Sequence, residues 1–350
     1  QDVRSDARSV LATWDELLTS RERLAETFAN AAGEGFAPAQ LDQVHAWCVQ
    51  KTRVRQESDR DGDTPTIDAE DDALILRVFQ RLRGALIDED QKPVKYAHIF
   101  VDEVQDGNPI ALRVLIDTAG KERCVTLAGD LAQRMLDDGD DRGEFDWDKL
   151  FEDLDVPHTV LEPLKVSYRS TAEITSFARH VLGPHAHSAE PIATRHGPPV
   201  ESFGFASVGE SVAFLADALK ELLRNEPSAN VALVARFGQQ ADVYYEGLVR
   251  AELPNVRRVR EQDFTWEAGV DVTDIRQTKG LEFDEVVLLD TNASSYPPNA
   301  QARHALYVGA TRAAHQLWCI ASDTPSQVVT DALEASAADA AAKVEASPDA

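Results

Sequence analysis

Two adjacent carboxylates stand at the end of a strongly apolar run, and their types suit phosphate chemistry. Asp102 and Glu103 directly follow Ile99–Val101, and Gln105 comes two positions later. In enzymes that hydrolyse nucleoside triphosphates, such a pair at the carboxyl end of a parallel strand supplies a Mg²⁺ ligand and a base that activates water. Asp102 is therefore the candidate metal ligand and Glu103 the candidate general base. On its own, an Asp-Glu pair is most often solvated surface.

Three side chains further along the chain could complete the same chemistry. Hydrolysis also needs a group that contacts the γ-phosphate and positive charge on the transferring phosphoryl group. Gln133 lies three residues past Asp130, at the end of the next expected strand. Arg169 and Arg312 carry planar guanidinium groups that suit phosphate oxygens. A lone Arg usually sits in a surface ion pair, but the order of all these groups favours one shared site.

Composition limits the class of protein that can hold these residues. The chain has 350 residues, of which 43% are hydrophobic and 27% charged, as in soluble globular proteins. It contains neither an apolar run of about 18 residues nor a signal peptide, so no membrane association is expected. Its odd and widely spaced Cys48, Cys124 and Cys319 argue against a disulfide framework or a zinc site and favour the cytoplasm.

The overall charge argues against simple binding to nucleic acid. The formal net charge is -26, from 35 Lys and Arg against 61 Asp and Glu. Affinity for DNA comes largely from neutralising phosphates, so a chain this acidic should be repelled unless a local basic groove overrides the field. An acidic surface also suits a protein partner with basic channels.

The elements that must position these residues follow an alternating pattern. Near-continuous apolar strands alternate with amphipathic helices, which predicts parallel sheets covered on both faces. Strand-like runs occur at 98–101, 124–127, 230–235, 270–275, 286–289 and 317–321, and helical runs at 110–118, 172–182, 207–224, 240–251 and 301–314. We expect two such α/β layers, with a boundary near residue 160.

Five segments resemble motifs of the Rep/UvrD-type superfamily 1 helicases, over about residues 95–322. They are Asp102–Asp106 (motif II), Leu127–Gln133 (motif III), Ser167–Ser170 (motif IV, with Ser for Asn), Lys279–Asp284 (motif V) and Tyr307–Ala313 (motif VI). The resemblance implies two RecA-like parallel-sheet P-loop NTPase domains, the first incomplete, after a helical N-terminal segment. The expected divisions are a helical segment with an acidic connector (1–72), the first domain (73–160), the second domain (161–324) and a disordered acidic, Ala-rich tail (325–350).

The resemblance also implies a role for each matching residue, with ATP and Mg²⁺ as cofactors. Asp102 would hold Mg²⁺, Glu103 would be the general base, and Gln105 and Gln133 would couple the γ-phosphate to the motor. Tyr168 would stack near the adenine, and Gly280 and Glu282 would bind the nucleotide, Glu282 through the ribose. Arg169 and Arg312 would be arginine fingers.

The chain departs from the family pattern in three places. It has no G-x-x-x-x-G-K-[ST] phosphate loop. In the family this loop precedes motif II, so we expect it in an upstream part of the same polypeptide. Arg276 stands where motif V usually begins with His, and the span from Arg169 to Lys279 leaves little room for the large insertion of the DNA helicases. These features resemble the helicase IV-like branch, which includes HelD-type factors that bind bacterial RNA polymerase.

Three functions follow as hypotheses. The first is an ATP-driven motor on single-stranded DNA, moving 3′ to 5′ by family resemblance, and inactive as this isolated chain. The alternative is a HelD-like ATPase that remodels RNA polymerase, which the acidic charge favours. The third is an NTPase domain without turnover, which the intact catalytic set disfavours. Trp147, Trp266 and Tyr296 are candidates for stacking on bases, although each more often serves the core.

Overall fold

A computed structural model describes residues 16–30, 37–61, 69–121, 124–130, 147–156, 159–186, 192–265 and 267–346. The chain forms two compact units. The first comprises Gln1–Gly129 and Asp146–Thr159, and the second Asp130–Phe145 and Val160–Ala350. No helix in the described ranges is long and apolar enough to cross a membrane.

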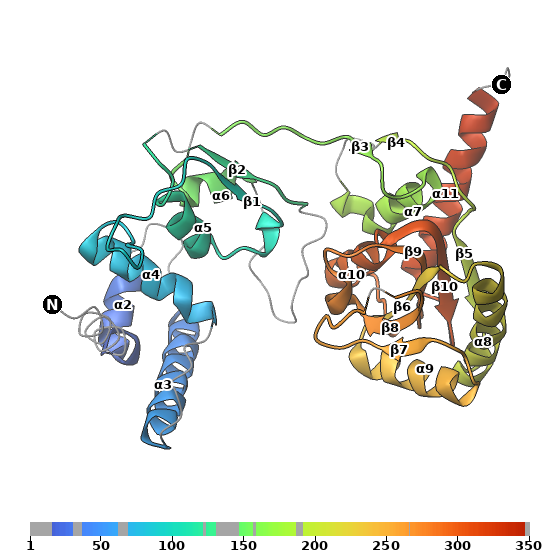
Figure 1. Cartoon of the computed structure of the whole chain (residues 1–350), viewed down its shortest axis with the longest axis horizontal. Helices are drawn as coiled ribbons and strands as arrows, with labels where there is room; N and C mark the ends of the chain where they lie inside the picture. Colours follow the sequence, from blue (N-terminus) through green and yellow to red (C-terminus); the bar gives the residue numbers. More distant parts are fainter. Residues whose placement is uncertain are drawn as a thin grey trace. The chain divides into compact units, whose positions relative to one another are not determined.

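The first unit is mostly helical and holds one short parallel sheet (Figure 1). Its elements are α2 (Arg21–Asn30), α3 (Pro38–Asp61), α4 (Ala69–Arg83), β1 (Ile99–Val101), η1 (Val104–Asp106), α5 (Pro109–Ile116), β2 (Val125–Leu127) and α6 (Trp147–Asp153). Strands β1 and β2 pair in register from Ile99 with Val125. Helix α3 continues through Asp61 and α4 begins at Ala69, both within the 1–72 segment that was predicted to hold helices and an acidic connector.

Helix α5 starts where the sequence provides a cap. The Asn108 side chain accepts a hydrogen bond from the Ile110 amide at 2.8 Å, and Pro109 occupies the first turn, where its missing N–H costs nothing. Leu112 and Val114 then bury the inner face of the helix. Helix α5 is thereby fixed directly after the Asp102-Glu103 segment.

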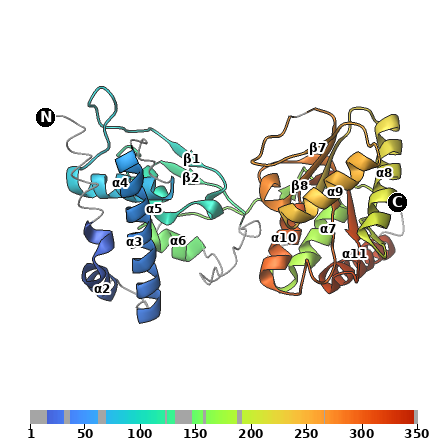
Figure 2. The ribbon, with the colours of Figure 1, turned by 90° about the horizontal axis from the view of Figure 1, so that it is seen from below.

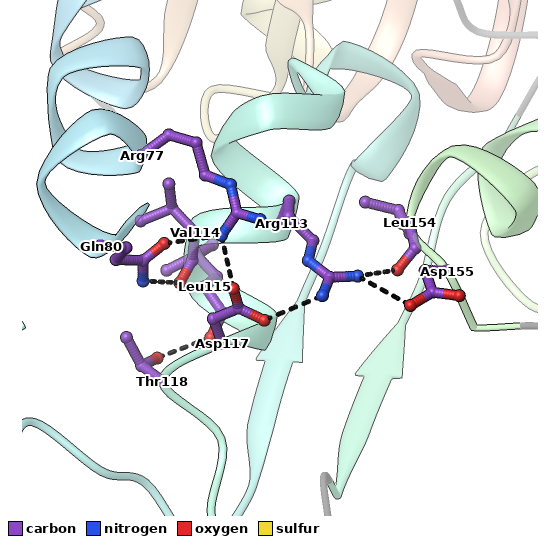
Figure 3. A network of polar contacts seen from close by, with 9 residues as sticks. All are labelled: Arg77, Gln80, Arg113, Val114, Leu115, Asp117, Thr118, Leu154 and Asp155. Atoms are coloured by element: carbon purple, nitrogen blue, oxygen red, sulfur yellow. Dashed lines mark hydrogen bonds and ion pairs between the residues drawn. The ribbon is translucent and has the colours of Figure 1, made fainter. Parts of the chain in front are cut away.

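A polar network joins α4, α5 and the end of α6, as Figure 3 shows. Asp117 pairs with Arg77 from α4, and its other oxygen lies 3.3 Å from the Arg113 guanidinium. Arg113 also donates to the Leu154 carbonyl, while Gln80 donates to the Val114 carbonyl at 3.0 Å. Asp117 is the acceptor shared by both arginines, so the packing of three segments depends on its charge.

Replacing Asp117 with Asn should lower the free energy of unfolding by about 1–3 kcal/mol, because two partly buried guanidinium groups lose their shared anion. The measurement is the shift of the urea unfolding transition of the chain. Asp90→Asn is the matched control, since the Asp90–Lys92 pair is about three-quarters exposed and should contribute little. Equal shifts for the two variants would contradict the assignment.

The second unit is built around a six-stranded sheet in which all paired strands are parallel, with strand order β5-β10-β9-β6-β8-β7. The strands of the second unit are β3 (Val166–Ser167), β4 (Ile192–Ala193), β5 (Glu201–Gly204), β6 (Asn230–Ala235), β7 (Val256–Arg258), β8 (Gly269–Asp274), β9 (Phe283–Leu288) and β10 (Ala313–Ala321), and β3 and β4 form a separate two-stranded sheet. The helices of this unit are α7 (Ala172–Leu182), η3 (Gly183–His185), α8 (Val208–Asn225), α9 (Gly238–Arg250), η4 (Ile275–Thr278), α10 (Ala300–Ala310) and α11 (Gln327–Ala346). The predicted α/β class with parallel sheets is confirmed.

Two separate cores cover the two faces of this sheet. Along β6, Val231 and Leu233 point into one core and Ala232 and Val234 into the other, as the two-residue period of a strand requires. Helices α8 and α9 cover the first face, and α7, α10 and α11 cover the second (Figures 1 and 2). The sheet is therefore buried on both sides, and its strand ends remain for function.

The predicted disordered tail is wrong for residues 327–346, which form α11. Val328 and Val329 are 1% exposed in the core beneath this helix. Further along, the Asp339 carboxylate lies 2.7 Å from His180 Nε2 and accepts from Ser176 at 3.2 Å, both on α7. Alanine is the best helix former, so an Ala-rich stretch with an apolar stripe forms a helix once α7 offers a surface.

Candidate functional site

The carboxylate pair of the first unit is ordered by its own backbone and by a buried glutamine. The Asp102 carboxylate accepts from the Glu103 amide at 2.9 Å, and Asp102 is exposed. The Gln105 side chain, only 4% exposed, donates its amide N–H to the Glu103 carboxylate. Gln105 therefore fixes the direction of the candidate general base.

Glu103 adopts a backbone conformation that non-glycine residues rarely occupy. Its φ is 51° and its ψ 42°, in the left-handed region, directly before the short helix η1. Such strained positions are concentrated at functional sites, where the surrounding structure holds them. Here Gln105 and the η1 turn hold Glu103 in place.

Gly129, at the end of the neighbouring strand β2, makes room for Gln105. A Cβ at this position would lie 2.5 Å from Gln105 Oε1 and 2.8 Å from a methyl of Val104, distances that real contacts do not reach. The Gly-Asp sequence after β2 is thus explained by the close approach of Gln105. Gln133, the candidate for γ-phosphate contact, lies outside the described residues.

The donor set at the end of β1 suits Mg²⁺. This ion is usually held by one or two carboxylates together with water and phosphate oxygens, and exposed Asp102 offers such an oxygen. In the described part of the chain no group of three or more His, Cys, Asp or Glu side chains forms a complete metal cage. The assignment of Asp102 as a Mg²⁺ ligand therefore stays a prediction.

In the second unit, two candidate residues from distant parts of the sequence meet directly. Arg169 Nε lies 2.7 Å from a carboxylate oxygen of Glu282, and the two side chains are 45% and 60% exposed. Tyr168 is 74% exposed beside them. An ion pair this exposed typically contributes about 0–1 kcal/mol to the free energy of unfolding. A phosphate group could therefore replace Glu282 as the partner of Arg169 with little loss of stability.

The loop that carries Glu282 depends on a glycine. Gly280 has φ +75°, a conformation that side chains other than glycine strain, although no atom lies within 4 Å of a Cβ built there. Asp274 caps the preceding η4 by accepting from the Arg276 amide at 3.1 Å. The sequence Lys-Gly-Leu-Glu therefore encodes one fixed turn between β8 and β9.

Arg312, the second candidate finger, is fully buried and braces that same loop. Its guanidinium donates to the Val308 carbonyl at 3.0 Å, to the Leu281 carbonyl at 3.2 Å and to Thr311 Oγ1 at 3.2 Å. Burial also raises the pKa of the neighbouring Tyr307 hydroxyl above its usual range. Arg312 thus links the end of α10 to the Gly280 turn, a role that the sequence did not predict.

Comparison with known proteins adds to this geometry. Residues 269–320, which run from β8 through the Gly280 turn and Arg312 into β10, match the family described as UvrD-like helicase C-terminal domain. The matched stretch lies within the second unit. The predicted resemblance to Rep/UvrD-type helicases is confirmed at this level, whereas the HelD-like branch stays a prediction.

Full-length relatives point the same way. The chain is 29% identical over 199 residues to the ATP-dependent DNA helicase UvrD2 of Mycobacterium tuberculosis, covering 54% of this chain and 28% of that protein. It is 24% identical over 196 residues to DNA helicase II of Haemophilus influenzae, covering 52% and 25%. The chain thus spans about a quarter of the length of the curated relatives it matches.

Among solved structures, the C-terminal domain of a possible DNA helicase from Lactobacillus plantarum is similar. It shares 23% identity, covers 47% of this chain and 94% of its own, and superimposes with a TM-score of 0.40.

The second unit also contains an exposed aromatic residue, Phe237, that the sequence patterns did not indicate. Phe237, at the end of β6, is 49% exposed, whereas the predicted stacking candidate Tyr296 is 0% exposed and belongs to the core. Trp147 packs against Phe151 at 5.6 Å between ring centroids, and Trp266 lies outside the described residues. The signal that could have indicated Phe237 is its position two residues after the predicted central strand 230–235.

Proposed function

We propose that this chain is the C-terminal motor portion of an ATP-dependent superfamily 1 helicase or translocase that moves on single-stranded DNA. The observation that carries the proposal is the match of 269–320 to a UvrD-like helicase C-terminal domain, because that stretch contains the loop of Gly280 and Glu282 and the Arg312 brace. Movement from 3′ to 5′ is part of the proposal and rests on family resemblance.

In this proposal each unit contributes its own share of the chemistry. Asp102 would bind Mg²⁺, and Glu103, directed by Gln105, would take a proton from the attacking water. Arg169 and Arg312 would offset the charge on the transferring phosphoryl group, Tyr168 would stack on the adenine, and Glu282 would bind the ribose. Gln133 and an upstream phosphate loop would complete the site. ATP bound with Mg²⁺ supplies the phosphoryl group that is transferred to water.

The topology of the second unit supports a place for the nucleic acid. Strands β6 and β9 are neighbours, yet α9 leaves β6 toward one face and α10 follows β9 on the other. In open α/β sheets, ligands bind at the carboxyl ends of the strands beside such a switch point. The residues that follow β6 are therefore the strongest candidates for contact with a strand.

Phe237 has the properties of a stacking residue at this point. Its backbone amide donates to Gln240 Oε1 at 3.2 Å, which fixes it as the cap of α9. The Arg236 guanidinium lies 5.0 Å from its ring centroid and is held by the Ser295 carbonyl and by Gln301 Oε1. An exposed aromatic ring backed by a cation suits a nucleobase, because every base offers a π face.

Replacing Phe237 with Ala in the full-length protein should weaken binding to an oligo-dT strand by about 1–3 kcal/mol, the typical contribution of one stacked base. Fluorescence anisotropy over a range of salt concentrations measures this, and the wild-type affinity should fall steeply with salt. Val243→Ala is the matched control, since Val243 is 55% exposed on the same helix α9 and should bind normally. Unchanged affinity in Phe237→Ala would remove the residue from the strand path.

The net charge of -26 favours a second candidate, an ATPase that remodels RNA polymerase. Acidic surfaces could occupy channels that normally hold nucleic acid, and direct affinity for DNA would then be weak. The same titration separates the two functions. No detectable strand binding by the full-length protein, together with co-purification of RNA polymerase, would overturn the DNA motor in favour of this alternative.

A further inference from the structure

A short segment after β4 runs alongside the residues that carry Arg169. Strands β3 and β4 pair in parallel from Val166 with Ile192. The pairing continues beyond them, since the Thr194 amide donates to the Ser167 carbonyl at 3.3 Å and the Arg195 carbonyl accepts from the Ala172 amide at 2.8 Å. The 194–197 segment therefore follows the backbone on both sides of Arg169.

Arg195 is the side chain of this segment that reaches the functional residues. Its Nη2 donates to the backbone carbonyl of Arg169 and also lies 3.4 Å from the Ala314 carbonyl. Its Nη1 lies 3.5 Å from His315 Nε2. The Arg169 carbonyl belongs to the loop that carries one candidate arginine finger. The Ala314 carbonyl belongs to β10, the strand that begins directly after the other candidate finger, Arg312.

A second link joins the same two places. The Ser170 hydroxyl, in a residue that is 6% exposed, donates to the Ala313 carbonyl at 2.8 Å. The Arg169 loop is thus tied to the start of β10 by a buried hydroxyl on one side and by the Arg195 guanidinium on the other. A planar guanidinium can serve two carbonyls at once, which a lysine ammonium on its flexible stem does less well.

We infer that Arg195 is a positioning residue, which holds the backbone of Arg169 in the orientation that its side chain needs for contact with a phosphoryl group. The inference rests on the proposed ATPase function. The Arg169 side chain itself is held by an exposed ion pair with Glu282, which is a weak restraint. The direction of Arg169 is therefore set mainly by its backbone, and Arg195 binds the carbonyl of that residue.

The segment that carries Arg195 is itself anchored. The Glu173 carboxylate accepts from the Gly197 amide at 2.9 Å and lies 3.0 Å from His196 Nδ1. Burial opposes ionisation of Glu173, yet hydrogen bonds from His196 and the backbone hold its pKa below the usual value. Glu173 lies in the first turn of α7, so hydrogen bonds connect this helix, the Arg169 loop and the 194–197 segment to one another.

The test is a double-mutant cycle on DNA-stimulated ATP turnover of the full-length protein. Arg195→Ala should lower kcat by about 10- to 100-fold with little change in KM, because a misplaced group loses mainly transition-state contact. Arg195→Lys should recover only part of the rate. Since Arg195 acts through Arg169, the double variant Arg169→Ala with Arg195→Ala should turn over no more slowly than Arg169→Ala alone.

A readout without nucleotide accompanies the kinetics. Hydrogen exchange of the 166–172 peptide should be faster in Arg195→Ala than in the wild type, with the rest of the second unit unchanged. Arg250→Ala is the control, since the Arg250 side chain is 77% exposed on α9 and, within the described part of the chain, pairs with Glu246 of the same helix. The inference would be overturned if the reductions in kcat of the two single variants multiplied in the double variant. It would also be overturned if hydrogen exchange of the 166–172 peptide were the same in Arg195→Ala as in the wild type. Absence of ATP turnover in the wild type would instead overturn the proposed function.

Discussion

The Glu103→Gln variant of the full-length protein is expected to hydrolyse ATP at least about 100-fold more slowly than the wild type while binding ATP nearly as well. The amide keeps the size of the side chain and its contact with Gln105, but it cannot accept a proton from water. General bases typically contribute 10²–10⁴-fold to rate, and the held position of Glu103 places it in that range. Binding survives because Asp102 and the phosphate contacts remain.

Steady-state turnover and equilibrium binding of a fluorescent ATP analogue measure the two effects separately. Glu152→Gln is the matched control, because Glu152 is exposed on α6 in the same unit and should behave as wild type. Turnover of Glu103→Gln near the wild-type rate would refute the assignment of the general base. A parallel loss of binding would mean that the substitution disturbs the β1 loop rather than the chemistry.

Arg312→Ala should reduce both stability and turnover. The substitution removes a buried guanidinium and leaves the Val308 and Leu281 carbonyls without its hydrogen bonds. The unsatisfied buried acceptors and the cavity together should lower the free energy of unfolding by about 3–5 kcal/mol, which is near the upper end of the range for single substitutions. Turnover should fall by 10³-fold or more if Arg312 also serves as an arginine finger.

Thermal unfolding and ATP turnover on the same samples distinguish a brace from a finger. Addition of free guanidinium to Arg312→Ala should restore part of the turnover only if the group contacts the transferring phosphate. Arg224→Ala is the control, since its exposed side chain donates, among the described residues, to a carbonyl of its own helix. A normal melting temperature for Arg312→Ala would show that the buried contacts do not support the Gly280 turn.

The sequence predicted the central strands of the sheet better than its outer strands. The central strands β6 and β9 were recognisable because their apolar runs are continuous. Strand β5 reads Glu-Ser-Phe-Gly and β7 reads Val-Arg-Arg, so neither shows an apolar run, and only pairing with β10 and β8 makes them strands. Residue preferences differ between edge and central strands, because side chains at the two positions differ in packing and burial.

The candidate site was predictable as a set of residues but not as a set of contacts. Motif spacing identified Arg169 and Glu282, yet only the fold brings them to 2.7 Å. Arg195 belongs to no motif, so nothing in the sequence separated it from other arginines. Arg312 was predicted as a charged group directed at a ligand, and its buried position became visible only with the α10 helix in place.

The docked helix α11 has a practical consequence for work with this protein. A chain shortened near residue 325, where sequence alone would end the domain, would lose the cover over Val181 and Phe177 on α7. Those side chains would then form an exposed apolar surface prone to self-association. Affinity tags and fluorescent reporters therefore belong beyond Ala346, and expression trials should keep the last helix.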